Sequence, residues 1–207
     1  MNSVQDTIFA RIQSLGRGAV FTPKDFLDLA SRDATDQALS RLVRSGSVQR
    51  VGRGLYYYPR SNAALGIDTP PDLDDIASAL GRQTGSRVAP SGAVAANRLG
   101  LSTQVAAVPV YLSDGRSRKV RVGRYIIQLR HVSPKRLPKG STTSALVFQA
   151  LQFVGKDNVD DRVVQTLKQR LSPKQRRDVL HDARYAADWI SDVARQVASD
   201  AEVPAHG

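Results

Sequence analysis

Polar and basic side chains between residues 32 and 53 have the chemistry needed to contact nucleic acid. Arg and Gln present paired hydrogen-bonding groups that match guanine and adenine edges, and Arg also binds phosphate oxygens without reading sequence. We assign base or backbone contacts to Arg32, Gln37, Ser40 and Arg41. We assign phosphate contacts to Arg44, Arg50 and Arg53. The alternative is that all seven are ordinary solvated side chains on an amphipathic helix and a hairpin.

The pattern of residues 31–59 predicts the elements that would position these side chains. Apolar residues recur at spacings of three and four, which places them on one face of a helix. They are Ala34, Ala38, Leu39, Leu42 and Val43. Gly46 then ends the helix, and strands over 48–51 and 55–58 are joined by a turn at Gly52-Arg53-Gly54. A helix followed by a basic hairpin is typical of a winged helix-turn-helix, whose third helix enters the major groove of DNA.

Two further helices are predicted before this stretch, one over residues 3–15 and one that starts at Thr22-Pro23. Three consecutive tyrosines, residues 56–58, invite a role in stacking on bases. We favour a core role for them, because alternating side chains of a strand cannot all face the same partner.

A second basic surface is predicted between residues 116 and 139, where nine bases occur without an acid. Solvated faces normally mix both signs, so an unopposed run indicates contact with a polyanion. Its members are Arg116, Arg118, Lys119, Arg121, Arg124, Arg130, Lys135 and Arg136, with Lys139 following. Strands over 105–112, 119–122 and 125–132 are expected to present them on a small antiparallel sheet. Pro109 is expected to place the first of these strands at a sheet edge.

The remaining patterns predict an α+β protein, with a winged helix-turn-helix followed by a C-terminal α+β domain. The domains are expected at residues 1–60 and 72–200, joined by a linker at 61–71 and followed by a frayed tail at 201–207. Helices are expected from Asp72, over 91–100, from Thr142 and over 159–171. A last, long helix is expected from Ser172-Pro173 to about Val197.

Composition limits the possible function classes. The 207 residues carry a formal net charge of +11, which favours a polyanionic partner. The charge belongs to residues 1–153, because residues 154–207 hold nine bases and nine acids. With no cysteine, three histidines and one glutamate, the chain offers no catalytic or metal-ligand motif, so we expect neither an enzyme nor a cofactor. No apolar run is long enough to span a membrane, and we expect a cytoplasmic protein without a membrane partner.

Three segments of the chain resemble the AbiEi-type antitoxins of type IV toxin–antitoxin systems, which act in abortive infection, a form of phage defence. They are ALSRLVRSGSVQRVGRGLYYYP at 38–59, SGAVAANRLGLSTQV at 91–105 and VYLSDGRSRKVRVGRYIIQLRHVSPKRL at 110–137. The first is shared by many winged-helix regulators, and the other two are more specific. The resemblance implies a transcriptional regulator that represses its own operon through its N-terminal domain. It also implies that the C-terminal domain counteracts a nucleotidyltransferase-like toxin, with or without direct contact.

Two alternatives follow from the residues themselves. The basic sheet at 116–139 could serve an RNA- or ribosome-associated protein, with the N-terminal domain as its scaffold. The charge-balanced helices after Gly155 could make a homodimer, because repressors often pair to read symmetric half-sites.

Overall fold

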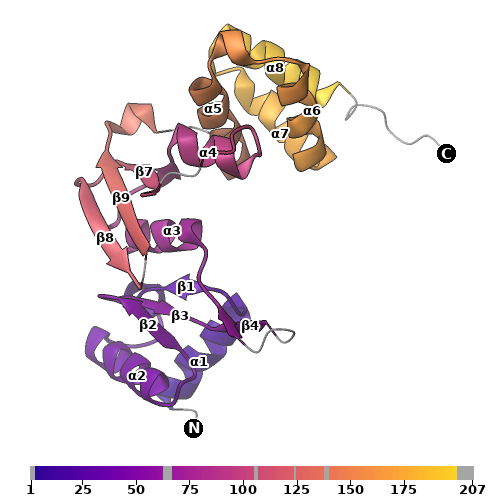
Figure 1. The fold of residues 1–207 in the computed structure, drawn as a ribbon. Helices are drawn as coiled ribbons and strands as arrows, with labels where there is room; N and C mark the ends of the chain where they lie inside the picture. Colours follow the sequence, from indigo (N-terminus) through magenta and orange to yellow (C-terminus); the bar gives the residue numbers. More distant parts are fainter. Residues whose placement is uncertain (1–2, 63–66, 105–106, 124, 138–139, 200–207) are drawn as a thin grey trace, which may run out of the picture. The chain divides into compact units, whose positions relative to one another are not determined.

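The fold mixes helices with small antiparallel sheets, as the α+β prediction requires (Figure 1). The structure is a computed structural model that describes residues 3–62, 67–104, 107–123, 125–137 and 140–199. Within these ranges, no helix is both long and apolar enough to cross a bilayer.

The chain forms two compact units. The N-terminal unit consists of residues 1–88 and 115–129, and the C-terminal unit consists of 89–114 and 130–207. The N-terminal unit therefore takes in a helix and a strand that the sequence analysis assigned to the second domain.

The N-terminal unit begins with α1 (Val4–Leu15), β1 (Val20–Phe21), the short 3-10 helix η1 (Pro23–Phe26) and α2 (Arg32–Arg44). Ser3 caps α1 and Ser31 caps α2, each by accepting a hydrogen bond from a backbone N–H in the first turn. Strands β2 (Gln49–Gly52) and β3 (Leu55–Tyr57) follow, and the three-stranded sheet has the order β1-β3-β2. β3 pairs antiparallel with both neighbours, with Tyr57 opposite Val20 on one side and Gln49 on the other.

One core holds these elements together. Its fully buried members include Ile8, Ile12, Phe21, Phe26 and Leu39. The core interpretation of the three tyrosines is confirmed, because all are at most 8% exposed. Tyr56 stacks on Phe21 with 6.1 Å between ring centroids, and the Tyr57 hydroxyl donates to the Thr69 carbonyl over 2.6 Å.

The helix predicted from Thr22-Pro23 is only one turn of 3-10 helix, η1. The predicted start at Thr22-Pro23 is correct, and the Thr22 N–H donates to Asp25 Oδ2 over 2.9 Å. The pattern overestimated its length, and Leu27 is 45% exposed after the turn ends.

The segment 61–71, expected to be a linker, contains paired strands. β4 (Arg60–Asn62) and β5 (Ile67–Thr69) are antiparallel, with Ser61 opposite Asp68. The Asp68 carboxylate accepts hydrogen bonds from Gln49 Nε2 at 2.8 Å and Ser61 Oγ at 3.0 Å. These bonds attach the segment to β2, a contact that local composition does not reveal.

Helix α3 (Leu73–Thr84) starts at Asp72 as predicted, with the Asp72 carboxylate accepting from the Asp74 N–H. Arg82 near its end fixes it to the first elements of the chain. The guanidinium pairs with Asp25 at 3.0 Å and donates to the Val20 carbonyl at 2.9 Å. These bonds explain why α3 belongs to the N-terminal unit.

A four-stranded sheet has the order β6-β7-β9-β8, formed by β6 (Val88–Pro90), β7 (Val110–Ser113), β8 (Arg118–Val122) and β9 (Tyr125–His131). The boundary between the units passes through β9. The expectation that Pro109 marks an edge strand is wrong, because β7 begins after Pro109 and lies between β6 and β9. Residues 105–106 of the predicted strand lie outside the described residues.

The C-terminal unit packs its helices around a core of its own. They are α4 (Gly92–Arg98), α5 (Thr142–Val154), α6 (Asp161–Arg170), α7 (Pro173–Ala183) and α8 (Asp188–Ala198), with the short turns η2 (Pro134–Arg136) and η3 (Lys156–Asn158). α4 lies close to α5, since a Cβ on Gly92 would sit 2.7 Å from Phe153 Cβ. Fully buried core residues include Ala95, Leu151 and Leu167.

The long helix predicted from 172 to 197 is two helices, α7 and α8. α7 ends at Ala183, whose carbonyl accepts a hydrogen bond from Ser191 Oγ of α8 at 2.7 Å. The apolar stripe continues through the break, because Ala183 and Ile190 both enter one core. Periodicity alone therefore could not locate the turn.

Candidate nucleic-acid interface

Helix α2 exposes the side chains that the sequence predicted for contacts with DNA. Its buried side carries Thr35, Ala38, Leu39 and Leu42. The opposite side has a shallow cavity of about 450 Å³, which brings together four of the predicted residues and one that was not predicted. They are Gln37, Ser40, Arg41, Arg44 and the additional Asp36.

Asp36 changes the expected role of one predicted residue. Its carboxylate pairs with Arg32 Nε over 2.8 Å, one turn away on the same helix. Arg32 is therefore engaged within α2, whereas Arg41 is exposed. Arg44 Nη2 donates to Ser40 Oγ at 3.4 Å, a long bond that leaves most of its guanidinium donors available.

The turn between β2 and β3 carries Arg53 and is held from two sides. Gln83 Nε2 of α3 donates to the Arg53 carbonyl over 2.9 Å. The Gly123 N–H, at the end of β8, donates to the Val51 carbonyl over 3.2 Å. Gly54 permits the first contact, since a Cβ there would lie 2.7 Å from Gln83 Nε2. Main-chain contacts thus fix the turn while the side chains of Arg50 and Arg53 stay exposed.

Strand β8 adds two cations to the same unit. Lys119 and Arg121 alternate with Arg118, Val120 and Val122 along the strand. Lys119 and Arg121 are exposed, whereas Arg118 turns inward and donates to the Leu80 carbonyl of α3 at 3.3 Å. On β8, two of the predicted surface residues, Lys119 and Arg121, therefore face outward, whereas Arg118 has a structural role.

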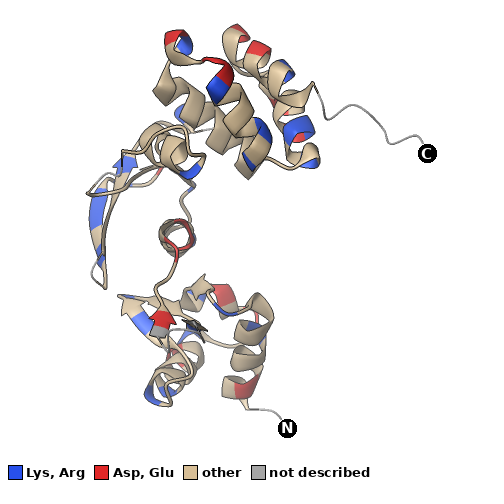
Figure 2. Ribbon diagram, turned by 45° about the vertical axis from the view of Figure 1, so that its right-hand side comes forward, with Lys and Arg blue, Asp and Glu red and all other residues tan. Residues whose placement is uncertain are grey.

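Most outward cations on α2, the β2–β3 hairpin and β8 lack an acidic partner in the described part of the chain. Among the residues that the structure describes, six of them form no ion pair with a carboxylate. These are Arg41, Arg44, Arg50, Arg53, Lys119 and Arg121. Figure 2 shows basic positions along α2, at β2 and along β8. A set of unneutralised guanidinium and ammonium groups on adjoining elements is suited to a row of phosphates.

The remaining members of the predicted second basic surface occur in both units. Arg116 is exposed in the N-terminal unit, and Arg124 and Lys139 lie outside the described residues. Arg130, Lys135 and Arg136 belong to the C-terminal unit. These three line a cavity of about 640 Å³ that also includes Gln149, Gln152, Asp182 and the 76% exposed Tyr185.

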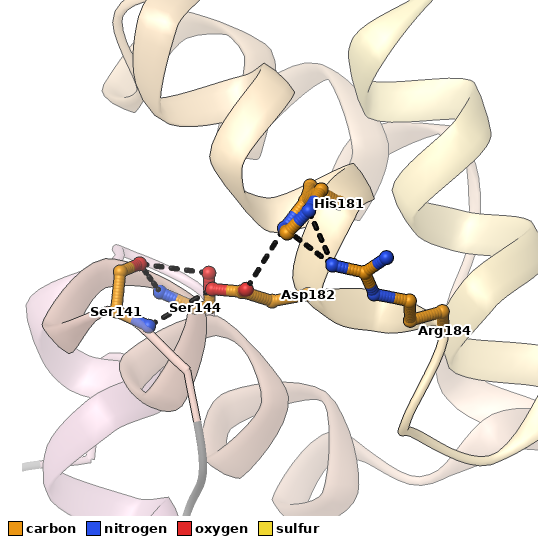
Figure 3. Close-up of polar contacts among 5 residues, drawn as sticks. All are labelled: Ser141, Ser144, His181, Asp182 and Arg184. Atoms are coloured by element: carbon orange, nitrogen blue, oxygen red, sulfur yellow. Dashed lines mark hydrogen bonds and ion pairs between the residues drawn. The ribbon is translucent and has the colours of Figure 1, made fainter.

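A cluster of Ser141, Ser144, His181, Asp182 and Arg184 in the C-terminal unit has side chains that could do acid–base chemistry (Figure 3). Asp182 accepts from the Ser141 N–H at 2.9 Å and contacts the His181 imidazole at 3.3 Å. The carboxylate therefore lies between the hydroxyls and the imidazole, whereas a nucleophilic triad needs the imidazole between the hydroxyl and the acid. Arg184 Nη2 contacts both nitrogens of the imidazole, Nδ1 at 3.2 Å and Nε2.

Asp182 helps to cap α5. The hydrogen bond from the Ser141 N–H lowers the pKa of Asp182 below its usual value, and contacts with Ser144 and His181 lower it further, against the opposing effect of burial. The ionised carboxylate thus satisfies a donor at the start of a helix. No group of metal-ligating side chains occurs within the described parts of the chain.

The sequence patterns give no sign of the residues that hold the β2–β3 turn. Gln83 is 30 positions from Arg53 along the chain, and Gly123 is still farther from Val51. The glycines of the hairpin indicated a tight turn, but nothing local indicated which elements would hold it.

The sequence belongs to a family described as a family of unknown function, DUF6088, whose model matches residues 7–179. A comparison with curated proteins found no match. Among solved structures, the crystal structure of the RV2827C protein from Mycobacterium tuberculosis is similar at 15% identity, covering 90% of this chain and 73% of that chain with a TM-score of 0.36. So distant a likeness carries no functional inference.

Proposed function

We propose that the protein is a DNA-binding repressor whose first elements act as a winged helix-turn-helix. In this proposal α2 is the recognition helix and the β2–β3 hairpin is the wing. The observation that carries it is the set of six outward cations without carboxylate partners on α2, the hairpin and β8. A typical repressor places such a helix in the major groove and uses the flanking cations on the phosphate backbone.

The proposed roles follow from the surroundings of each side chain. Gln37 near the middle of α2 and Arg41 in its last turn are both exposed, and they are assigned to base edges. Arg44, Arg50, Arg53, Lys119 and Arg121 are assigned to phosphates. Arg32 is assigned a smaller role, because the carboxylate of Asp36 partly offsets its charge.

The resemblance to AbiEi-type antitoxins extends this proposal to the biological partner. The protein would repress its own operon and counteract a nucleotidyltransferase-like toxin through the C-terminal unit. The test is co-expression with the product of an adjacent nucleotidyltransferase-like gene. We expect growth to be rescued by the full chain, and continued growth arrest would contradict the antitoxin part.

DNA binding is tested separately with the duplex upstream of the protein's own reading frame. We expect this duplex to bind more tightly than a random duplex of equal length, and bulk RNA to compete poorly. Equal affinity for both duplexes would contradict the repressor proposal.

A second candidate function is RNA binding by the C-terminal unit. The specific observation is that Arg130, Lys135 and Arg136 line one cavity with the exposed ring of Tyr185. Cations beside an exposed aromatic ring suit an unpaired base and its phosphates. If bulk RNA displaces the duplex, and if Tyr185→Ala abolishes this competition, the second function is favoured.

A further inference from the structure

A different basic cavity lies in the N-terminal unit, outside the proposed interface. It measures about 520 Å³ and is bordered by α1, the turn before β1, β1 itself, η1, β4 and α3. Since β1 and β2 are opposite edges of the three-stranded sheet, this cavity lies at the β1 edge, away from β2. Its charged lining consists of Arg11, Arg17, Arg60, Arg82, Asp25 and Asp75.

Two of the four arginines are already neutralised by carboxylates. Arg82 pairs with Asp25 through Nε at 3.0 Å and Nη2 at 3.3 Å. Arg11 pairs with Asp28 at 3.1 Å. Among the described residues, Arg17 and Arg60 form no ion pair with a carboxylate. The cavity thus holds two guanidinium groups whose charge is not compensated by a direct partner.

Both of these guanidinium groups are held in position by neutral groups. Arg17 lies over the ring of Tyr58, with Cζ 4.9 Å from the centroid, and donates to the Pro59 carbonyl at 2.9 Å. Arg60 Nη2 donates to the Arg17 carbonyl at 3.2 Å. Arg60 also lies against Gly18, where a Cβ would be only 2.9 Å from Nη2. A side chain at Gly18 would therefore displace Arg60.

These contacts use few of the available donors. A guanidinium carries five N–H groups in a planar fork that matches two oxygens of a phosphate. Because backbone carbonyls and an aromatic ring already restrict both side chains, little rotamer freedom is left to lose on binding. A cavity of about 520 Å³ is within the range that small ligands occupy.

We propose that this cavity binds a small phosphate-bearing ligand, whose phosphate or diphosphate group is held by Arg17 and Arg60. Asp25 stays paired with Arg82, which limits its repulsion of an anion. The site is independent of the proposed repressor function, because none of its residues belongs to the DNA-contact set.

The direct test is calorimetric titration of the full chain with pyrophosphate at low salt. We expect saturable binding that Arg60→Gln weakens about tenfold or more, as expected for loss of a charge-assisted hydrogen bond. Arg60→Lys should weaken it less, because the charge remains while the planar fork is lost. Lys24→Gln is the matched control, since exposed Lys24 lies in the same unit but does not line the cavity.

Three results would overturn the proposal. The first is a lack of saturable pyrophosphate binding, and the second is an Arg60→Gln affinity equal to that of the unaltered protein. The third is an equal loss in Lys24→Gln, because attraction would then follow overall charge. Thermal unfolding without pyrophosphate shows whether Arg60→Gln is folded, and Arg17→Lys provides a second variant of the same site.

Binding of duplex DNA tests whether Arg60 holds the phosphate of a small ligand or a phosphate of the DNA backbone. We expect Arg60→Gln to bind the upstream duplex with the affinity of the unaltered protein. If duplex affinity falls about tenfold instead, Arg60 contacts DNA and the assignment to a small ligand is wrong.

Discussion

The two compact units hold similar numbers of cations in different settings. The N-terminal unit contains 16 Lys or Arg residues and nine acids, whereas the C-terminal unit contains 14 and ten. In the first, Arg41, Arg50 and Arg53 face solvent without a carboxylate partner among the described residues. In the second, Arg130, Lys135 and Arg136 are also exposed without a carboxylate partner among the described residues, but they line a cavity together with Tyr185. The number of cations in a unit therefore indicates less about its function than the side chains that surround each cation.

In the N-terminal unit, the residues that hold the elements together are not the outward cations that we propose to contact DNA. Gln83, Gly123 and Arg118 donate to main-chain carbonyls and hold the elements of the N-terminal unit in place. The outward side chains are then left for a partner. Both units also have an apolar core of their own, so the contrast between them lies in the contacts of their charged side chains.

The largest expected effect is the salt dependence of duplex binding. If six outward cations meet phosphates, the logarithm of affinity falls with a slope of about −5 against the logarithm of salt, since each contact contributes about −0.9. Affinity should then fall about a thousandfold between roughly 50 and 200 mM salt. Fluorescence anisotropy with the upstream duplex measures this slope, and a slope near zero would contradict phosphate binding by this unit.

A smaller effect is expected from Arg41→Ala on α2. If Arg41 reads a base, binding to the upstream duplex should weaken by about 1–3 kcal/mol, and binding to a random duplex should weaken less. Arg195→Ala removes the same charge from α8 and serves as the control. Equal losses on the two duplexes would remove the base-reading role of Arg41 and leave it a phosphate contact.

Removing the Asp182 carboxylate that helps to cap α5 should have the smallest effect of the three changes. It should leave DNA binding unchanged. Asp182→Ala should lower the free energy of unfolding by about 1 kcal/mol near pH 7, as loss of a helix cap typically does. Asp157→Ala, at an exposed position of η3, is the control.

The pH dependence of this variant follows from the lowered pKa of Asp182. The ionised carboxylate stabilises the fold above its unfolded pKa of about 3.9, and this contribution is lost as pH falls through the lower folded pKa. The stability difference between Asp182→Ala and the unaltered protein should therefore shrink in acid. A constant difference down to about pH 2 would contradict the role of the charge.

Local signals in the sequence predicted much of the secondary structure. The helices expected over residues 3–15 and from Asp72 begin at the caps Ser3 and Asp72, because a cap is a property of a few adjacent residues. The apolar stripe of α2 predicted which face would be exposed. It did not predict the pairing of Arg32 with Asp36, although both lie on the same helix one turn apart.

Other features depend on contacts between distant residues. The break between α7 and α8 is held by Ser191 and Ala183 within a continuous apolar stripe. The attachment of α3 depends on Arg82 meeting Asp25, 57 residues earlier. The sequence also did not show that the boundary between the two units falls within the basic run from 116 to 139.

The central claim is that duplex DNA is bound by the outward cations of the N-terminal unit. The most direct measurement compares two full-length triple variants by anisotropy at one salt concentration, Arg41→Gln/Arg50→Gln/Arg53→Gln and Arg130→Gln/Lys135→Gln/Arg136→Gln. Each removes three positive charges. We predict a loss of about a hundredfold or more in affinity for the upstream duplex in the first, and a change within about threefold in the second. Equal losses, or a greater loss in the second, would contradict the claim.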